Sequence, residues 1–382
     1  MKAIIIGGGI GGLTTAIALK QQNIDFEIYE AAPELRPVGA GIVMASNAMQ
    51  VFQRLGIEKK VMEAGLEVQR AFGVDENFKV ISGLDMKGKI APRYGIGSYA
   101  IHRGRLQQVL LSEIDEVKVY LNKRLDRVVQ SDTKATAHFQ DGTSVEADLI
   151  IGADGIRSAV RKSIFGDLPL RYSGQTCWRG MTKFRLPDDK KNNSYEMWGS
   201  QKGLRFGFVP TAEDEVYFFT TYYIEEGGHD NEPVKEKLLR IFSPFGDLPK
   251  RIIEATPDGN IIRSDISDLA PIAQWWKGRV VLLGDASHAT TPNLGQGGCQ
   301  AVEDAYVLSL CLRQYSNFET ALEKFQAMRF EKANYVVSMS WQFGKMTNLG
   351  NPIARWLRNN LMRLMPESTA IKQLDKILRL EY

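Results

Sequence analysis

A glycine-rich turn near the N-terminus constrains the fold of this chain more than any other feature. Residues 2–6 form a short apolar run that is typical of a buried strand, and Gly7-x-Gly9-x-x-Gly12 follows it directly. Residues 11–22 have helical composition, and residues 26–30 form a second strand-like run. The order of strand, glycine turn, helix and strand predicts a βαβ unit in which the turn connects the first strand to the helix.

Each small or acidic residue of this unit has a physical role in binding a dinucleotide. Gly7 allows the tight turn, Gly9 lets the backbone approach a pyrophosphate, and Gly12 allows the helix to pack closely on the strand. Glu30 lies 18 positions after Gly12, at the end of the second strand, where a carboxylate suits ribose hydroxyls. The complete pattern predicts a dinucleotide-binding domain rather than a glycine turn of purely structural purpose.

Two further apolar runs in distant parts of the chain also end in glycine. Residues 148–151 precede Gly152-Ala-Asp-Gly155, and residues 279–283 precede Gly284-Asp285. Ligands of open parallel α/β sheets bind beyond the carboxyl ends of the strands. We therefore expect these three strand ends to converge on one long ligand.

The middle of the chain has a different pattern, with alternating segments that are typical of antiparallel hairpins. The dinucleotide-binding domain is then discontinuous, because its strands lie on both sides of this β-rich insertion. We expect an α/β fold with a Rossmann-like domain, an inserted antiparallel substrate domain and C-terminal helices. The predicted boundaries are 1–70, 100–170 and 272–345 for the first, 71–99 and 171–271 for the second, and 346–382 for the helices.

Composition excludes several classes of protein. The 48 Lys and Arg residues nearly balance 45 Asp and Glu, so we expect no nucleic-acid partner. The three cysteines, Cys177, Cys299 and Cys311, form no C-x-x-C pair, which supports neither a disulfide framework nor a metal site. No apolar run approaches the roughly 18 residues of a membrane span, and the N-terminus lacks a cleavage signal. We expect a cytoplasmic protein without integral membrane contact.

Two further motifs accompany the fingerprint, namely Gly152-Ala-Asp154-Gly155 and Gly284-Asp285 followed by Gly295-Gln-Gly-Gly298. Taken alone, Asp154 suits a helix cap, Asp285 a turn and the glycine cluster a flexible loop. In this order, however, the three motifs resemble those of the class A flavoprotein monooxygenases of the para-hydroxybenzoate hydroxylase type. The resemblance spans most of the chain, and Cys299 after the glycine cluster brings it nearest to the FAD-dependent urate hydroxylase and zeaxanthin epoxidase branches.

The resemblance assigns FAD-binding roles to four residues outside the fingerprint. It implies that Asp285 binds the ribityl chain, that Asp154 lies beside FAD and the nicotinamide path, and that Arg103 lies near the ribose or phosphates. The segment that begins at Arg36 resembles the family's loop after the second strand. A plain surface arginine is the alternative for Arg103.

The glycine cluster also has a direct chemical rationale. Reduced flavin carries negative charge, which free backbone N–H groups at a helix N-terminus stabilise. We therefore expect a flavin site at Gly295, Gly297 and Gly298. His288 has no partner identifiable from the sequence, so we interpret it as fixing the turn beside the flavin.

Only one fingerprint is present, so the sequence predicts no second Rossmann domain for a nicotinamide cofactor. This agrees with the resemblance, which implies FAD as cofactor and NADH or NADPH as a transient co-substrate. It further implies that oxygen and reduced flavin form a C4a-hydroperoxyflavin, which hydroxylates a small electron-rich ring. We expect a monomer or homodimer that uses no metal.

The hairpin from Leu204 to Tyr223 is the strongest candidate for substrate recognition. If its turn centres on Thr211, Arg205 lies opposite Tyr217, and the two side chains clamp an anionic or carbonyl-bearing ring. A cross-strand pair on a solvated face is the alternative. Urate hydroxylases have an Arg and a Tyr at this separation, so the resemblance favours urate as the substrate.

Other activities of this scaffold remain open. Oxidation of a tetracycline-like polycycle, epoxidation of an alkene and flavin-linked reduction are alternatives, whereas the W-x-W-x-I-P segment of halogenases is absent. A binding module like the Rab GDP-dissociation inhibitors is a third class, which the two intact additional motifs disfavour.

The segment from Ile353 to Leu364 is predicted to be a basic amphipathic helix. It combines an apolar stripe that contains Trp356 with Arg355, Arg358 and Arg363. We expect the stripe to dock on the protein, with contact to a membrane surface as the alternative.

Overall fold

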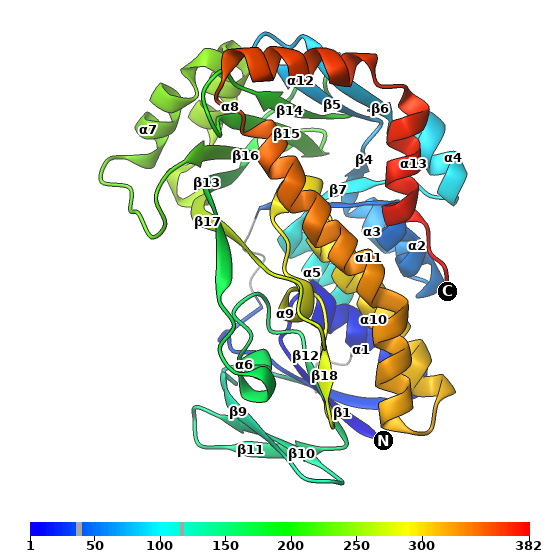
Figure 1. Cartoon of the computed structure of the whole chain (residues 1–382). Coiled ribbons are helices and arrows are strands. Elements are labelled where there is room, and N and C mark those ends of the chain that lie inside the picture. Colours follow the sequence, from blue (N-terminus) through cyan, green and yellow to red (C-terminus); the bar gives the residue numbers. More distant parts are fainter. Residues whose placement is uncertain (36–39, 115–117) are drawn as a thin grey trace.

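The computed structural model describes residues 1–35, 40–114 and 118–382. Its first sheet has five parallel strands and one antiparallel edge strand (Figure 1). The order across this sheet is β18 (Trp276–Lys277), β19 (Val280–Leu282), β12 (Leu149–Gly152), β1 (Lys2–Ile6), β2 (Asp25–Tyr29) and β8 (Val119–Tyr120). The three strands that end next to glycine are therefore neighbours, as predicted, with Gly152 paired to both Ile6 and Leu282.

The two faces of this sheet are covered differently, because alternate residues of a strand point to opposite sides. Ala3 and Ile5 of β1 pack into a helical layer, whereas Ile4 and Ile6 pack toward a small sheet and α6. The helical layer contains α1 (Ile10–Gln21), α2 (Ser46–Arg54), α3 (Glu58–Glu63), α5 (Arg103–Leu111), α10 (Gly297–Gln314) and α11 (Phe318–Thr347). The other side contains β9 (Leu125–Gln130), β10 (Ala135–Phe139), β11 (Ser144–Ala147) and α6 (Ala159–Phe165).

A second, seven-stranded sheet is antiparallel except for one parallel pair. Its order is β17 (Ile261–Leu269), β13 (Leu170–Lys183), β16 (Glu215–Tyr223), β15 (Arg205–Ala212), β14 (Asn193–Trp198), β5 (Arg70–Asp75) and β6 (Val80–Asp85). One face carries an aromatic core that includes Phe206, Phe208 and Phe218 and is covered by α7 (Val234–Ile241) and α8 (Asp247–Ala255). The other meets a sheet of β3 (Gly41–Met44), β7 (Tyr99–His102) and β4 (Gly65–Glu67).

The register of the β15–β16 hairpin differs from the prediction. Arg205 pairs with Thr221, and Tyr217 pairs with Val209, so Arg205 does not lie opposite Tyr217. The reversal lies at residues 213–214, and the register shifts between Pro210 and Ala212. The prediction was wrong because it placed the turn at Thr211, two residues too early. An even shift keeps side chains on their faces, so Arg205 and Tyr217 still share the side opposite the aromatic core.

The C-terminal helices connect the two sheets. In Figure 1, α11 runs diagonally from the first sheet to the second, α12 (Pro352–Leu364) crosses the end of the second sheet, and α13 (Glu367–Leu378) returns along the side. The end of α13 contributes Ile377 and Leu378 to the helical core beside the first sheet. Short elements complete the chain: α4 (Ala91–Tyr94), α9 (Asp285–His288), a π-helical turn (Met86–Ile90) and 3-10 turns at Ser243–Phe245, Asp258–Asn260 and Pro292–Leu294. No helix among the described residues has the length and apolar character needed to cross a bilayer.

Candidate cofactor and substrate site

The glycine fingerprint has the geometry that a dinucleotide requires. Gly7 has a φ of +112°, and a Cβ there would lie 2.4 Å from the carbonyl oxygen of Ala153. A Cβ on Gly12 would lie 1.9 Å from the carbonyl oxygen of Gly7, so the approach of α1 to β1 also requires glycine. Gly9 caps α1, and no atom of the described residues lies within 4 Å of its Cβ position. The helix N-terminus is thus open to a negatively charged group.

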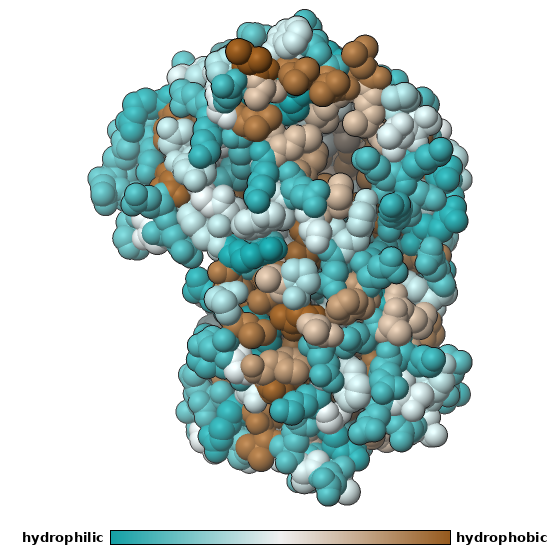
Figure 2. Space-filling model, in the orientation of Figure 1, coloured by the Kyte–Doolittle hydropathy of each residue, from teal (hydrophilic) through white to brown (hydrophobic). Residues whose placement is uncertain are grey.

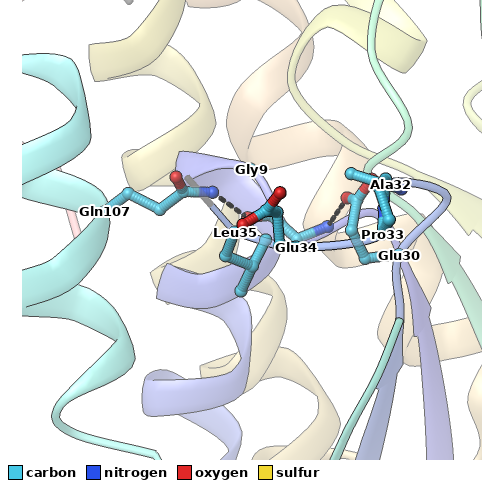
Figure 3. Close-up of a pocket in the computed structure, with 8 residues that line it drawn as sticks. Gly9, Glu30, Ala32, Pro33, Glu34, Leu35 and Gln107 are labelled. Carbon is cyan, nitrogen blue, oxygen red and sulfur yellow. Dashed lines mark hydrogen bonds between the residues drawn. The ribbon is translucent and has the colours of Figure 1, made fainter. Parts of the chain in front are cut away.

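Glu30 lies beside this opening and is held by two backbone groups. Its carboxylate accepts hydrogen bonds from the N–H of Gly8 at 2.6 Å and of Ala32 at 2.7 Å. Figure 3 shows the surrounding cleft of about 450 Å³, which is lined by Gly8, Gly9, Glu30, Ala32, Pro33, Glu34, Leu35 and Gln107. The cleft offers space next to a carboxylate that has further acceptor capacity for ribose hydroxyls.

Gln107 is a residue of this cleft that the sequence reasoning missed. Its Nε2 donates to the carbonyl oxygen of Gly8 at 2.9 Å, which connects α5 to the glycine turn (Figure 3). It lies one helical turn after Arg103, at the i+4 position of the same helix. That spacing, read from the sequence, was the signal that could have identified it.

Asp154 accepts hydrogen bonds at the start of α6, whose N-cap residue is Ser158. Its carboxylate accepts from the Ser158 hydroxyl at 2.5 Å and from the N–H of Ala159 at 2.7 Å and Val160 at 3.1 Å, at the start of α6. Burial raises the pKa of Asp154, against the lowering effect of these hydrogen bonds. Contact between Asp154 and FAD stays a prediction.

Arg161 links this capped segment to the second predicted flavin motif. It donates to the carbonyl oxygens of Ile156 at 2.6 Å and Ala286 at 3.0 Å. The segment after β12 and the segment after β19 are therefore fixed to each other by one buried guanidinium. This role of Arg161 was not foreseen from the sequence.

The second flavin motif brings Asp285 to the start of α10. An Oδ1 atom of Asp285 lies 3.6 Å from the Cβ position of Gly297, and α10 begins with Gly297 and Gly298 without a side-chain cap. Asp285 is exposed to solvent, but the protein atoms around its carboxyl raise its pKa, while the charges of His288 and Arg103 act to lower it. The structure thus brings together Asp285, Arg103 and the open helix N-terminus, with Gly295 in the left-handed conformation just before it.

A buried ionic network supports this loop from behind. Asp304 of α10 accepts from the Gly284 N–H at 2.8 Å, lies 2.6 Å from Nε2 of His288, and accepts from Nε of Arg329 at 2.7 Å. Burial raises the pKa of Asp304, but the His288 and Arg329 charges outweigh this effect and hold the pKa well below its ordinary value. His288 therefore has the structural partner that the sequence did not reveal.

Glu303 extends the network to other elements. It accepts from Arg329 at 2.7 Å, from Asn47 of α2 at 2.6 Å, and from Lys332 and the Tyr382 hydroxyl at 2.8 Å each. Glu303 and Arg329 are fully buried. The start of α10 is thus held by charges from α11 and by the C-terminal segment.

Arg205 is part of a junction between elements and is not free in the pocket. It is 2% exposed, and its guanidinium donates to Thr221 of β16, Glu196 of β14, Thr347 of α11 and Asn293 of the Pro292–Leu294 turn, at 2.7–3.2 Å. Because Tyr217 lies four residues from Thr221 along β16, Arg205 and Tyr217 are separated by roughly 13 Å of strand. The two do not form one clamp.

Tyr217 has a different arginine as its neighbour. Its ring lies on Gly41 of β3, and Met181, its partner on β13, places Arg179 two residues away on the same sheet face. Burial raises the pKa of Tyr217, and the neighbouring Arg179 and Arg103 act to lower it. Arg179 donates to Ser264 at 2.7 Å, but its buried Nε has no hydrogen-bond partner among the described residues. Arg179 was missed because the assumed register already gave Tyr217 a partner.

Three further predictions concern Arg36, metal binding and Cys299. Arg36 lies outside the described residues. Within the part of the chain that the structure describes, no three potential ligands form a metal-binding group. Cys299 is buried, and burial raises the pKa of its thiol to about 12, as befits a small packing residue.

Comparison with known proteins decides the family. A family model described as an FAD binding domain matches residues 1–338. The chain belongs to this FAD-binding family. Aurachin C monooxygenase/isomerase from Stigmatella aurantiaca is 41% identical, over 96% of this chain and 94% of the relative. A 2-heptyl-3-hydroxy-4(1H)-quinolone synthase from Pseudomonas aeruginosa is 31% identical, over 97% and 95%.

A solved structure agrees with these relatives. Klebsiella pneumoniae HpxO complexed with FAD and uric acid superposes with a TM-score of 0.91 at 29% identity, over 99% of this chain and 96% of that one. The chain is therefore an FAD-dependent monooxygenase of the class A type, and the predicted fold class and FAD cofactor are confirmed. The open N-termini of α1 and α10 and the cleft beside Glu30 fit this cofactor.

Proposed function

We propose that this FAD-dependent monooxygenase hydroxylates a bicyclic heteroaromatic ring of the 4-quinolone type, with NADH or NADPH as reductant. The proposal rests on the side chains around Tyr217, which are mostly apolar. Its sheet face is flanked by Val68, Ala100 and Val209, with Arg179 as the nearby polar partner. A ring with one carbonyl and an apolar body suits such a wall, because a buried polar group without a partner costs free energy.

The relatives support a ring of this class. One relative is named for a 4-quinolone ring with a heptyl chain, and the relative with 41% identity is named aurachin C monooxygenase/isomerase. Urate is the second candidate, which the likeness to HpxO with uric acid favours. A purine of several carbonyl and N–H groups needs more polar partners than the face around Tyr217 offers, and Arg205 is already engaged by four other side chains.

In this proposal, different residues of the chain bind FAD, bind the substrate and position the cofactor loop. The N–H groups at the starts of α1 and α10, with Glu30, Arg103 and Asp285, hold FAD, which supplies electron transfer and oxygen activation. Tyr217 donates a hydrogen bond from its neutral hydroxyl to the ring carbonyl, and Arg179 orients that hydroxyl. Arg205 fixes the Pro292–Leu294 turn through Asn293 and is a positioning residue. The apolar wall excludes water from the reacting ring.

Substrate-dependent NAD(P)H oxidation by the purified flavoprotein tests the proposal. NADH and NADPH are each supplied in air with a 2-alkyl-4-quinolone that lacks the 3-hydroxyl, with urate, or with neither. We expect the quinolone to accelerate oxidation and to yield a product heavier by one oxygen atom in mass spectrometry. Acceleration and oxygenation of urate alone would replace the quinolone with the second candidate. If neither ring accelerates NAD(P)H oxidation or gains an oxygen atom in a protein that retains FAD, the proposed class of substrate is wrong.

A further inference from the structure

The C-terminal helix α12 exposes a continuous apolar stripe. Six of the thirteen exposed large hydrophobic residues among the described residues lie on this helix or directly after it: Ile353, Trp356, Leu357, Leu361, Leu364 and Met365. Ile353 and Leu364 are 77% and 78% exposed. Four of the six recur at the spacing of one helix face, and Figure 2 shows the resulting brown ridge at the top of the molecule, over α12.

The basic side of α12 faces the protein instead. Arg358 donates to the last carbonyls of α11, Met346 and Thr347, at 3.1 Å each, and lies 4.8 Å from the ring of Trp198. Arg355 donates to Gly199 at 3.3 Å, and Arg363 to the carbonyl of Val80 at 3.0 Å. The expectation that the Leu/Trp stripe docks on the protein was therefore wrong. The end of α11 leaves carbonyls that need donors, and the arginines supply them.

The chain around α12 carries an excess of basic residues, and Asp75 is an acidic neighbour that lies 3.8 Å from Arg363. No acidic residue occurs between Glu331 and Glu367, whereas four basic residues of this stretch lie on or near α12: Lys345, Arg355, Arg358 and Arg363. Lys345 is exposed at the end of α11, and exposed Lys202 packs against Gly350 just before α12. An apolar ridge with basic flanks complements a surface that is apolar inside and anionic at its boundary.

We propose that the apolar face of α12 docks on a lipid bilayer that contains anionic headgroups. The helix of 13 residues is about 20 Å long, shorter than the ~30 Å hydrocarbon core, so it lies in the interface and does not span it. Aliphatic side chains and Trp356 on one face with basic residues beside them are typical of interfacial helices. A second copy of this chain would match the apolar stripe but would bring the same positive charge against it.

Vesicle co-sedimentation of the full-length holoenzyme tests this docking. Vesicles of phosphatidylcholine are compared with vesicles that also contain phosphatidylglycerol, at low and high salt. We expect the enzyme to sediment with the anionic vesicles, at least five-fold less with pure phosphatidylcholine, and less at high salt. The variant Leu357→Glu with Leu361→Glu should lose at least five-fold in bound fraction, because two charges enter the apolar face.

The matched control places the same charges elsewhere. Val129→Glu with Met328→Glu alters two exposed apolar residues remote from α12 and should bind as wild type does. FAD absorbance and NAD(P)H oxidation without lipid should be equal in all three proteins. A wild type that stays in the supernatant with both vesicles, equal binding of the Leu357/Leu361 variant, or equal binding to both lipids would overturn the proposal. A dimer in analytical ultracentrifugation that this variant abolishes, without vesicle binding, would assign the face to a second copy.

Discussion

At the scale of single residues, Gly7 and Gly12 set the geometry of the glycine turn, because a Cβ at either position would collide with a carbonyl oxygen. Gly7 and Gly12 could be assigned because only glycine tolerates the observed close approaches to carbonyl oxygens. Arg179 could not be assigned, because its relevance depends on the strand register that brings it beside Tyr217. Backbone requirements are local in sequence, whereas side-chain partners across a sheet are not.

Asp285 permits a direct test of the flavin site. The substitution Asp285→Ala should weaken FAD binding at least tenfold, about 1.4 kcal/mol, because it removes the acceptor beside the start of α10. Titration of the apoprotein with FAD, followed by flavin fluorescence, measures the effect. Asp285→Asn, which keeps an acceptor oxygen, should lose less. Full affinity in the alanine variant would remove Asp285 from the site.

Tyr217 permits a test of the substrate side. Tyr217→Phe should lower the yield of hydroxylated product per NAD(P)H consumed several-fold, because the ring carbonyl loses its donor, while FAD stays bound. Hydrogen peroxide and product are quantified together. Tyr222→Phe serves as the control, since Tyr222 packs against the aromatic core on the other sheet face. Unchanged coupling in the Tyr217 variant would contradict its contact with substrate.

At the scale of elements, periodicity located helices and strands well but did not reveal what faces them. The first two strands, the helix between them and the β15–β16 hairpin were predicted from apolar spacing, and the faces of Phe206, Phe208 and Phe218 were correct. The hairpin register failed because it depends on turn and bulge geometry within residues 210–215. The prediction of which face of α12 packs on the protein was wrong, because an amphipathic pattern defines two faces but does not say which one is buried.

Arg329 on α11 is the central cation behind the flavin loop. Arg329→Met should destabilise the protein by about 3–5 kcal/mol, because it removes the buried guanidinium that the carboxylates of Glu303 and Asp304 share. Urea unfolding of the holoenzyme measures the loss, and FAD release should precede global unfolding in the variant. Lys324→Met, a cation elsewhere on the same helix, is the control. Equal stability of both variants would show that the network contributes little.

Tyr382 connects the C-terminal segment to the same network and adds a pH dependence. Burial, and next to it the charge of Glu303, raise its pKa well above the ordinary value of 10.0. A raised folded-state pKa stabilises the fold below pH 10, and this contribution is lost as pH rises further, when the unfolded tyrosine ionises first. Tyr382→Phe should therefore flatten the decline of stability above pH 10, measured by urea unfolding at pH 8 to 11. A decline identical to that of wild type would contradict the assignment.

At the scale of the whole molecule, the two sheets meet at a junction of buried polar contacts. Arg205 joins β14, β15 and β16 to the Pro292–Leu294 turn on the cofactor side and to the end of α11, and Arg358 of α12 donates to that same end at Thr347. The proposed lipid-docking helix α12 is thus connected to Arg205 through Thr347, which both Arg205 and Arg358 contact. The domain division from the sequence stays a prediction, but such a junction would set the distance between the cofactor and the substrate wall.

Arg205 therefore offers a test of how that distance controls the reaction. Arg205→Met should leave FAD bound and yet raise hydrogen peroxide formation several-fold at the expense of product, because Asn293 loses the donor that fixes the flavin-side turn. Arg205→Lys should restore part of the coupling, since it keeps one charged donor. Arg358→Met is the matched control: it removes a donor to Thr347 without touching Asn293 and should destabilise the protein while sparing the coupling ratio. If both methionine variants uncouple equally, the effect is general loosening of the junction, and Arg205 has no specific positioning role.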